Sequence, residues 1–450
     1  MADISRKFKV LSLYAVTTTV LGIAIFYSLI PIMQQGETGE AVIPSIKEME
    51  KPDKYSYSVT MSPMGTVYFE HIPQRVLTGD SNYNEILAAT RDAHKIIKTS
   101  YLHHRYDGFY NQIPGFQSGM NWEALSRFAS SPDSLPFDKE LLYELKSDIH
   151  HLDPIQIMLW KGWTREDVEE ISQNVGPFFA NRGSRDYPLD RKKIAPYSVK
   201  KAQNTADGSS SAARLPDFDN YEVYTLWELS DKIAQVYKKQ NVVAQIKAMA
   251  DTMTKEIQSK LPPPEKQPKV GLLFYGMNRF TPYKLHNGGF GQAQYQAVWA
   301  QDAFDALDAY GNSIFKANGK RPAASGNATP IGTAMDLEAL AACNPDVIIF
   351  PMAIYPGYNQ TEYQELLKLK SDPVAKHINA IKNNRIYPGG TFFQGPIYYL
   401  FQVEMAAKQI YPELFGAYRN DQNYPPEEQL FSRQRLAKIL KEAEDAPTLQ

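Results

Sequence analysis

The sequence has a single cysteine, Cys343, in 450 residues. One cysteine excludes an internal disulfide and any metal site built from several cysteines. An alanine-rich stretch precedes it and an apolar run follows, so we interpret Cys343 as a small buried hydrophobic residue. The chain also lacks a dominant sign of charge. Its 48 Lys and Arg against 50 Asp and Glu leave a net charge of −2, which gives no electrostatic basis for binding nucleic acid.

Motifs for catalysis and metal binding are scarce as well. The glycines of "HNGGFGQ" at residues 286–292 have neither a following Lys-Ser/Thr nor the G-x-G-x-x-G spacing, so they predict a loop rather than a phosphate site. The neighbours His103 and His104, like His150 and His151, lack the four-residue separation of the helical zinc motif. We therefore expect no catalytic residue, no metal site and no resident cofactor.

The length and the hydrophobic pattern favour two lobes, each with its own core. Short apolar runs alternate with helical patterns in both halves, which predicts α/β lobes with mostly parallel sheets. A helical run at residues 242–261 ends at three prolines and spans roughly 30 Å at 1.5 Å per residue. Smaller elements include strands at 66–69 and 154–160 and a capped helix from Thr164.

The N-terminal residues have the pattern of a membrane segment. Arg6, Lys7 and Lys9 precede an apolar stretch at residues 10–33, about the ~20 residues that cross a bilayer. A cleaved signal peptide is the alternative, but its apolar region is usually ~7–15 residues and ends at an A-x-A-like site, which is missing here. We expect an uncleaved single-pass anchor in the cell membrane. The positive charges then place the bulk of the chain outside the cytoplasm.

Residues 331–415 form one continuous pattern. They contain a helix start, "CNPDVIIFP" (343–351), "LLKLKSDPVAKHINAIKNNRIYPGG" (366–390) and "GPIYYLFQVEMAAKQIYPELF" (395–415). This sequence resembles the C-terminal lobe of the class III substrate-binding proteins that feed ABC importers of iron-siderophores, haem and cobalamin. The resemblance is specific across residues 242–415 and weak before them, where residues 101–147 look enlarged.

The resemblance implies an α/β fold of two Rossmann-like lobes joined by a single long interlobe helix, here preceded by one N-terminal transmembrane helix. The expected division of the chain is a membrane anchor (1–36), a spacer (37–54), an N-terminal α/β lobe (55–240), the interlobe helix (241–263), a C-terminal α/β lobe (264–418) and a helical tail (419–450).

A short pattern occurs twice. Glu123 in "NWEAL" and Glu338 in "DLEAL" each follow a capping residue and a large apolar residue at a predicted helix start. A carboxylate is favoured there by the helix dipole, so two unrelated well-capped helices would explain the repeat. In the resembled family, one exposed Glu at such a position in each lobe docks on arginines of the permease. The resemblance therefore implies that Glu123 and Glu338 are permease-docking residues.

Aromatic and arginine side chains follow the predicted strands in both lobes. Ligands of open α/β sheets lie outside the carboxyl ends of the strands. Rings stack on planar ligands and arginines bind anionic oxygens, so the set favours a large planar or anionic ligand, although loop packing could explain any one member. The residues expected in the site are Tyr83, Trp160, Trp163 and Arg182 in the first lobe, and Tyr275, Asn278, Arg279, Tyr355, Tyr358 and Phe392 in the second.

Together these features predict a membrane-tethered, extracytoplasmic substrate-binding protein rather than an enzyme. Its cargo would be a small metal chelate, above all an iron-siderophore, and its partners an ABC permease with its ATPase. Two alternatives stay open, a tethered extracellular hydrolase and a surface adhesin, both on α/β lobes. A neighbouring permease and ATPase pair in the genome would favour the binding protein over both.

Overall fold

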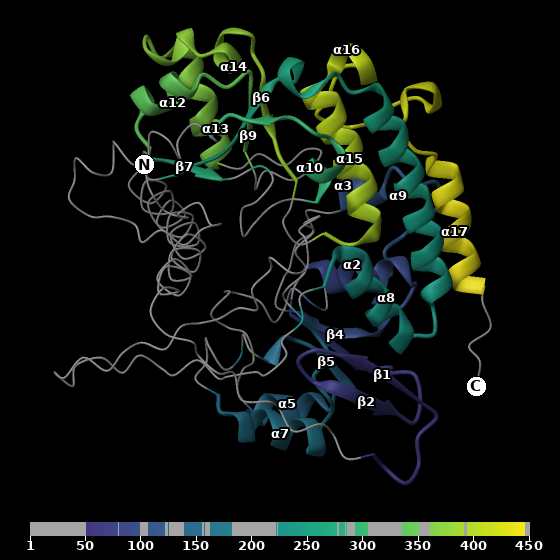
Figure 1. Ribbon diagram of the computed structural model, residues 1–450. Helices are drawn as coiled ribbons and strands as arrows, with labels where there is room; N and C mark the ends of the chain where they lie inside the picture. The colour runs from purple at the N-terminus through teal and green to yellow at the C-terminus, as the bar shows by residue number, and fades with distance from the viewer. Residues whose placement is uncertain are drawn as a thin grey trace, which may run out of the picture.

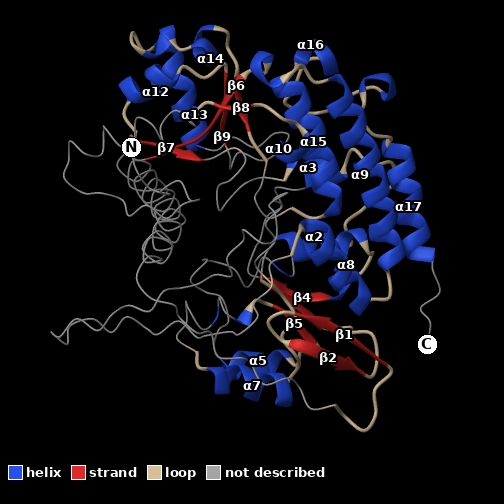
Figure 2. Ribbon diagram, viewed as in Figure 1, coloured by secondary structure: helices blue, strands red, loops and turns tan. Residues whose placement is uncertain are grey.

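The computed structural model shows its two larger sheets near opposite ends of the molecule, with a column of helices running between them (Figures 1 and 2). The structure describes residues 51–79, 81–99, 107–121, 125, 139–154, 157, 163–181, 222, 224–276, 279–283, 285, 293–304, 335–350, 361–390 and 394–445.

The first sheet has the strand order β4-β3-β5, and both strand pairs are parallel. The strands are β3 (Val76–Thr78), β4 (Ile96–Thr99) and β5 (Ile149–His151), and beside them β1 (Tyr57–Met61) and β2 (Gly65–Phe69) form an antiparallel hairpin. All three residues of β3 and of β5 are buried. This is expected of a parallel sheet that is covered on both faces.

The second sheet has the order β10-β9-β6-β7, with β8 also paired to β6. Its strands are β6 (Lys269–Gly276), β7 (Arg279–Tyr283), β8 (Gln301–Asp302), β9 (Val347–Phe350) and β10 (Ile386–Pro388). Only the β6–β7 pair is antiparallel among these strands. The four residues "VIIF" of β9 are fully buried, as the continuous apolar run predicts.

Helices connect the strands and cover the sheets. The first half contains α2 (Ser81–Ala89), α3 (Asp107–Tyr110), α5 (Lys139–Leu145), α7 (Arg165–Asn174), α8 (Leu226–Val236) and α9 (Gln240–Lys260). The second half contains α10 (Gln294–Ala297), α12 (Leu337–Cys343), α13 (Thr361–Leu367), α14 (Asn379–Lys382), α15 (Pro396–Ile410), α16 (Pro412–Phe415) and α17 (Arg433–Asp445). Figure 2 shows α12, α13 and α14 gathered on one side of the second sheet, with α10 and α15 on the other.

Local sequence explains where α7 begins. The Thr164 hydroxyl accepts a hydrogen bond from the Asp167 N–H at 3.2 Å, and the Asp167 carboxylate accepts one from the Thr164 N–H at 2.7 Å. This reciprocal capping box satisfies two N–H groups that a helix start leaves without partners. The capped helix predicted from Thr164 is confirmed, as is the long helical run that becomes α9.

The strand predicted at residues 154–160 is wrong. The strand lies earlier, at β5, and Pro154 and Ile157 are helical, with the Ile157 N–H donating to the Asp153 carbonyl at 3.3 Å. Proline cannot donate to a sheet ladder, but it fits the first turn of a helix. The two described residues of this apolar run are therefore helical, and the buried strand instead contains two histidines.

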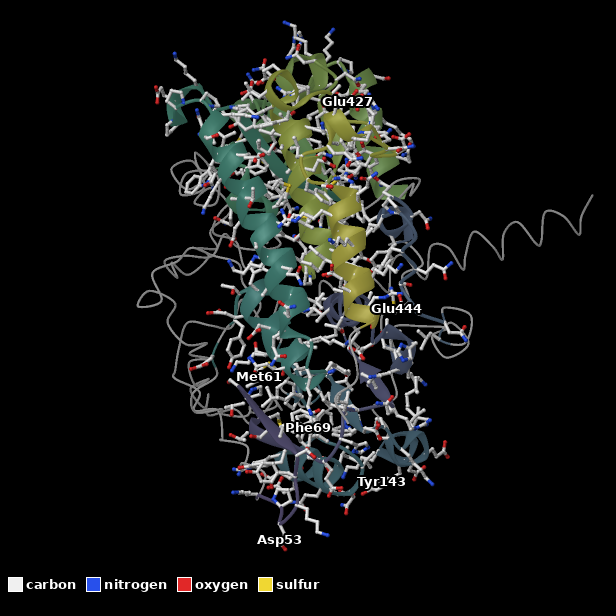
Figure 3. All side chains as sticks on the ribbon, turned by 90° about the vertical axis from the view of Figure 1, so that its right-hand side faces the viewer. Asp53, Met61, Phe69, Tyr143, Glu427 and Glu444 are labelled. Atoms are coloured by element: carbon white, nitrogen blue, oxygen red, sulfur yellow. The ribbon has the colours of Figure 1, made fainter. Side chains whose placement is uncertain are left out.

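Three long helices form a column along the molecule, α9, α15 and α17 (Figure 3). Helix α17 packs antiparallel on α9: the Lys239 ammonium before α9 donates to the carbonyl of Ala443 near the end of α17 at 2.5 Å. Beyond it, Glu444 forms a 3.1 Å ion pair with Arg91, which follows α2. At its other end, Arg433 is paired with Glu404 of α15. The tail therefore contacts both lobes, which its polar sequence did not reveal.

The enlarged segment at residues 101–147 contributes α3 to the contact between the lobes. The Phe109 ring lies 5.6 Å from the Tyr398 ring and 5.1 Å from the Phe401 ring, and the Tyr110 ring lies 5.3 Å from that of Tyr398. All four side chains are buried. A single apolar core therefore continues from the first lobe into α15.

The predicted membrane anchor at residues 1–36 lies outside the described residues. Within the part of the chain that the structure does describe, no helix is both long enough and apolar enough to cross a bilayer.

Candidate functional site

The carboxyl ends of the two sheets meet at one contact between helices. Strand β3 ends at Thr78 and leads directly into α2, while β10 ends at Pro388 and the chain enters α15 at Pro396. Helices α2 and α15 pack on each other (Figure 1). Ligands of α/β folds lie at the carboxyl ends of parallel strands, so the α2–α15 contact marks the centre of the candidate site.

Glu85 of α2 connects the two helices by hydrogen bonds. Its Oε1 atom accepts hydrogen bonds from the N–H groups of Ile397 at 2.6 Å and Tyr398 at 3.2 Å, at the start of α15. The side chain is fully buried. Burial raises the pKa of the Glu85 carboxyl to about 8, against the lowering effect of the two N–H groups. The hydrogen bonds between α2 and α15 are therefore made by a carboxyl group that keeps its proton at a higher pH than an ordinary glutamate.

Buried amide side chains surround the same point. The Gln394 Nε2 donates to the Gln294 Oε1 of α10 at 2.5 Å, and both residues are buried. In the first lobe, the Thr78 hydroxyl donates to the Asn84 Oδ1 at 2.5 Å, and the Asn84 Nδ2 donates to the Thr99 hydroxyl at 3.0 Å. These bonds fix the ends of β3 and β4 to α2, so the strand ends form a rigid base for the segments that follow them.

His151, at the end of β5, forms hydrogen bonds to two other segments of the first lobe. Its Nδ1 lies 2.7 Å from the Phe179 carbonyl oxygen, and its Nε2 lies 2.9 Å from the Tyr237 hydroxyl. A carbonyl only accepts, so Nδ1 carries the proton and Nε2 accepts from Tyr237. Burial lowers the pKa of His151 to about 4, so the ring is neutral at pH 7. His151 is therefore a fixed structural group of the first lobe.

Tyr83 is used inside the same lobe. Its ring stacks on His151 with 5.7 Å between ring centres, and its hydroxyl donates to the Asn181 carbonyl at 2.9 Å. The Asn181 N–H donates back to the hydroxyl at 2.8 Å. Only 1% of Tyr83 is exposed. Because both the ring and the hydroxyl of Tyr83 contact other residues of the first lobe, its position does not favour a direct contact with a ligand.

Three other predicted ligand residues lie in described segments. Trp163 is half-buried before α7, with its ring edge-on to Phe178 at 6.4 Å. Tyr275 lies near the end of β6, half-buried and 4.9 Å from the Phe280 ring. Arg279 is the first residue of β7 and pairs with Gly276 of β6. Tyr275 and Arg279 thus lie at one end of the same hairpin, whereas Trp163 belongs to the first lobe.

The remaining predicted ligand residues stay predictions, because they lie outside the described residues. They are Trp160, Arg182, Asn278, Tyr355, Tyr358 and Phe392.

The structure describes only one of the two glutamates that were predicted to dock on a permease. Glu338 is exposed in the first turn of α12, and Asp336 caps this helix by accepting from the Ala339 N–H at 2.8 Å. The predicted capped helix with an exposed carboxylate is therefore confirmed in the second lobe. Glu123 lies outside the described residues, although the Leu125 N–H donates to the Asn121 carbonyl at 3.0 Å, as in a helical turn.

A serine–histidine pair bears on the hydrolase alternative. The Ser147 hydroxyl and the His150 Nε2 are 2.7 Å apart, a distance suited to a nucleophile and its base. Both side chains are buried, and His150 lies beside the backbone of Gly176 rather than a carboxylate. Burial lowers the pKa of His150 to about 3. This pair is closed to substrate and lacks an orienting acid, so it does not favour hydrolysis.

Among the described residues, no three His, Cys, Asp or Glu side chains come together so as to hold a metal ion.

Glu85 is the important residue that the sequence analysis missed. The only signal in the sequence is that Glu85 is the one acidic residue of "SNYNEILAA" and directly precedes its apolar half; in the structure all nine residues are buried. Charged residues are almost never fully buried without a partner. The contact of Glu85 with the start of α15 has no local signal, because it depends on the packing of segments 312 residues apart.

Neither a protein-family model nor a curated protein matches the chain. The chain is similar to a solved periplasmic binding protein from Veillonella parvula, with a TM-score of 0.49 and 12% identity over 83% of this chain and 100% of that one. It is similar to the petrobactin-binding protein of Bacillus subtilis, with a TM-score of 0.48 and 13% identity over 80% and 99%. It is also similar to the triscatecholate siderophore-binding protein of Bacillus subtilis, with a TM-score of 0.43 and 14% identity over 79% and 98%. All three are named as binding proteins rather than enzymes.

Proposed function

We propose that this chain is an extracytoplasmic, membrane-tethered substrate-binding protein that captures a metal chelate, an iron-siderophore, and delivers it to an ABC permease. One observation carries the proposal: the carboxyl ends of parallel strands from two separate sheets lead into the α2–α15 contact. A site shared by two α/β lobes suits a protein that holds a ligand between them without chemistry. The sequence resemblance of residues 331–415 supports the same role and adds the permease.

Binding of a ferric chelate is expected to raise the melting temperature of the protein. A ligand at about 100 times its Kd stabilises the native state by about 2.7 kcal/mol. The measurement is a thermal-shift screen against a ferric hydroxamate, a ferric catecholate, haem and cobalamin, each with a metal-free counterpart as control. A shift with haem or cobalamin alone would replace the siderophore while keeping the class of protein. Failure of all four, with the protein folded, would contradict the proposal.

The membrane anchor leads to a separate expectation. The full chain should sediment with membranes after a high-salt wash, because residues 1–36 supply an apolar stretch of the length that spans a bilayer. A variant lacking residues 1–36 should remain in the supernatant. The matched measurement is N-terminal sequencing of the mature protein. A chain that begins near Gln35 would show that the segment is a cleaved signal peptide instead.

A further inference from the structure

The contact between α2 and α15 has an unusual composition. Helix α15 begins with Pro396, which has no N–H, so Ile397 and Tyr398 carry the first N–H groups of the helix. Such groups have no partner within their own helix. Both donate to one oxygen of Glu85, which comes from the other lobe. The start of α15 is thus capped by a residue that is 312 positions away in the sequence.

The second oxygen of Glu85 is buried and has no hydrogen-bond partner. It faces Gly395, where an added Cβ atom would lie only 1.4 Å from it. The glycine therefore allows the carboxyl group to approach the helix start closely. Since the other side of the carboxyl is not held by a cation or a donor, an ionised Glu85 would leave part of its charge unsolvated.

Charged groups on the neighbouring elements do not compensate Glu85. The causes that shift its pKa are burial and the two N–H groups. Nearby, Lys95 is paired with Asp92 at 2.6 Å, and the Glu404 carboxylate on α15 is paired with Arg433. The charged and titratable residues on the helices and the 3-10 turn that pack against α2 are Tyr398, Tyr399, Glu404 and Lys408 of α15, Glu228, Asp231 and Lys232 of α8, and Asp92, His94 and Lys95 around the short 3-10 turn Ala93–Lys95.

We propose that Glu85 is a proton-operated latch between the two lobes, tight while its carboxyl group carries a proton and loosened when the proton leaves. The neutral carboxyl keeps the two hydrogen bonds to α15 at no cost in buried charge. The ionised carboxyl gains from hydration, which requires α2 and the start of α15 to separate. The latch concerns the empty protein, so it goes beyond the proposed function and does not depend on the ligand.

The sign of the pH dependence follows from linkage. The pKa of Glu85 is about 8 in the folded protein against an ordinary value of 4.5. Between these values the folded state holds a proton that an open or unfolded state releases. Raising the pH therefore favours opening, by about tenfold in the equilibrium constant per pH unit for one proton. The contribution of the latch is fully present below pH 4.5 and is lost as the pH rises through 8.

The test compares the full chain with Glu85→Gln, without ligand, from pH 5 to pH 9. Glutamine keeps the acceptor for both N–H groups and cannot ionise. Hydrogen–deuterium exchange of Ile397 and Tyr398, corrected for the intrinsic rate, reports the opening of the latch directly. In the wild type, protection of these amides should fall about tenfold per pH unit up to about pH 8. In Glu85→Gln it should stay constant with pH.

Glu256→Gln on the exposed face of α9 serves as the matched control and should follow the wild type. Urea unfolding gives a second measurement: the unfolding constant of the wild type should rise relative to that of Glu85→Gln over the same range. Parallel pH profiles of the wild type and Glu85→Gln would overturn the proposal. If Glu85→Gln does not fold, a pH-independent protection of Ile397 and Tyr398 in the wild type would overturn it equally.

Discussion

Uptake of the cargo is expected to stop when Glu123 and Glu338 are both replaced with alanine. The expectation rests on the proposed role as a binding protein, in which one carboxylate of each lobe pairs with arginines of the permease. Charge-assisted pairs of this kind fix register and orientation between proteins. Loss of both would leave the loaded protein without its two anchoring contacts. The measurement is uptake of the labelled chelate by cells that contain the permease.

The double variant should still fold and bind its ligand with unchanged affinity. Glu338 is exposed, and replacing it leaves the helix cap intact, in which the Ala339 N–H donates to the Asp336 carboxylate. Removing a carboxylate near a helix start costs only about 0.3–1 kcal/mol. Glu256→Ala combined with Glu427→Ala removes two exposed carboxylates elsewhere and serves as control. Normal uptake by the Glu123/Glu338 variant would show that these residues are ordinary surface groups.

Glu404→Ala is expected to lower the free energy of unfolding by about 3–5 kcal/mol, because it leaves the buried guanidinium of Arg433 without its counter-charge. Arg433 is 4% exposed and Glu404 is fully buried. The guanidinium carbon lies 4.6 Å from the Phe401 ring centre and 3.9 Å from that of Phe431. The Glu404 carboxylate also accepts from the Leu430 N–H at 2.5 Å. Urea unfolding followed by circular dichroism measures the loss.

Two further variants separate the buried charge from other causes. Glu442→Ala removes an exposed partner of Lys438 on the same helix and should change the unfolding free energy by less than about 0.5 kcal/mol. Glu404→Leu combined with Arg433→Met replaces the pair with apolar side chains, which should recover most of the stability. If Glu404→Ala were as mild as Glu442→Ala, the pair would not stabilise the attachment of α17.

Elements encoded by local pattern were predicted well. The capped helix from Thr164 and the apolar run that becomes β9 each depend on residues a few positions apart. In these segments, side-chain hydrogen bonding and burial reinforce the backbone preference, so sequence reasoning had a direct physical signal.

Other features depend on packing between distant segments. His150 and His151 are buried in a strand: Ser147 pairs with Nε2 of His150, and Phe179 and Tyr237 pair with the two ring nitrogens of His151. None of these partners is marked in the local sequence. The same holds for the candidate site. Tyr83 was expected at the ligand, yet its hydroxyl bonds to the backbone of Asn181. A sequence shows that a side chain is chemically suited to binding a ligand, but the fold determines whether that side chain contacts other residues of the protein instead.

The attachment of α17 also has a mechanical consequence. Two helices that pack together along their length resist bending more than two separate helices, because bending requires one helix to slide along the other. Helices α9 and α17 pack together in this way. The side chains of Leu436, Leu440 and Ala443 on α17 are buried, and the Lys239 ammonium donates a hydrogen bond to the Ala443 carbonyl. Swinging one lobe against the other would shear this pair and stretch the Arg91–Glu444 contact. If the protein holds a ligand as proposed, we therefore expect the column to stay straight on loading and the shape changes to be confined to the ends of the strands.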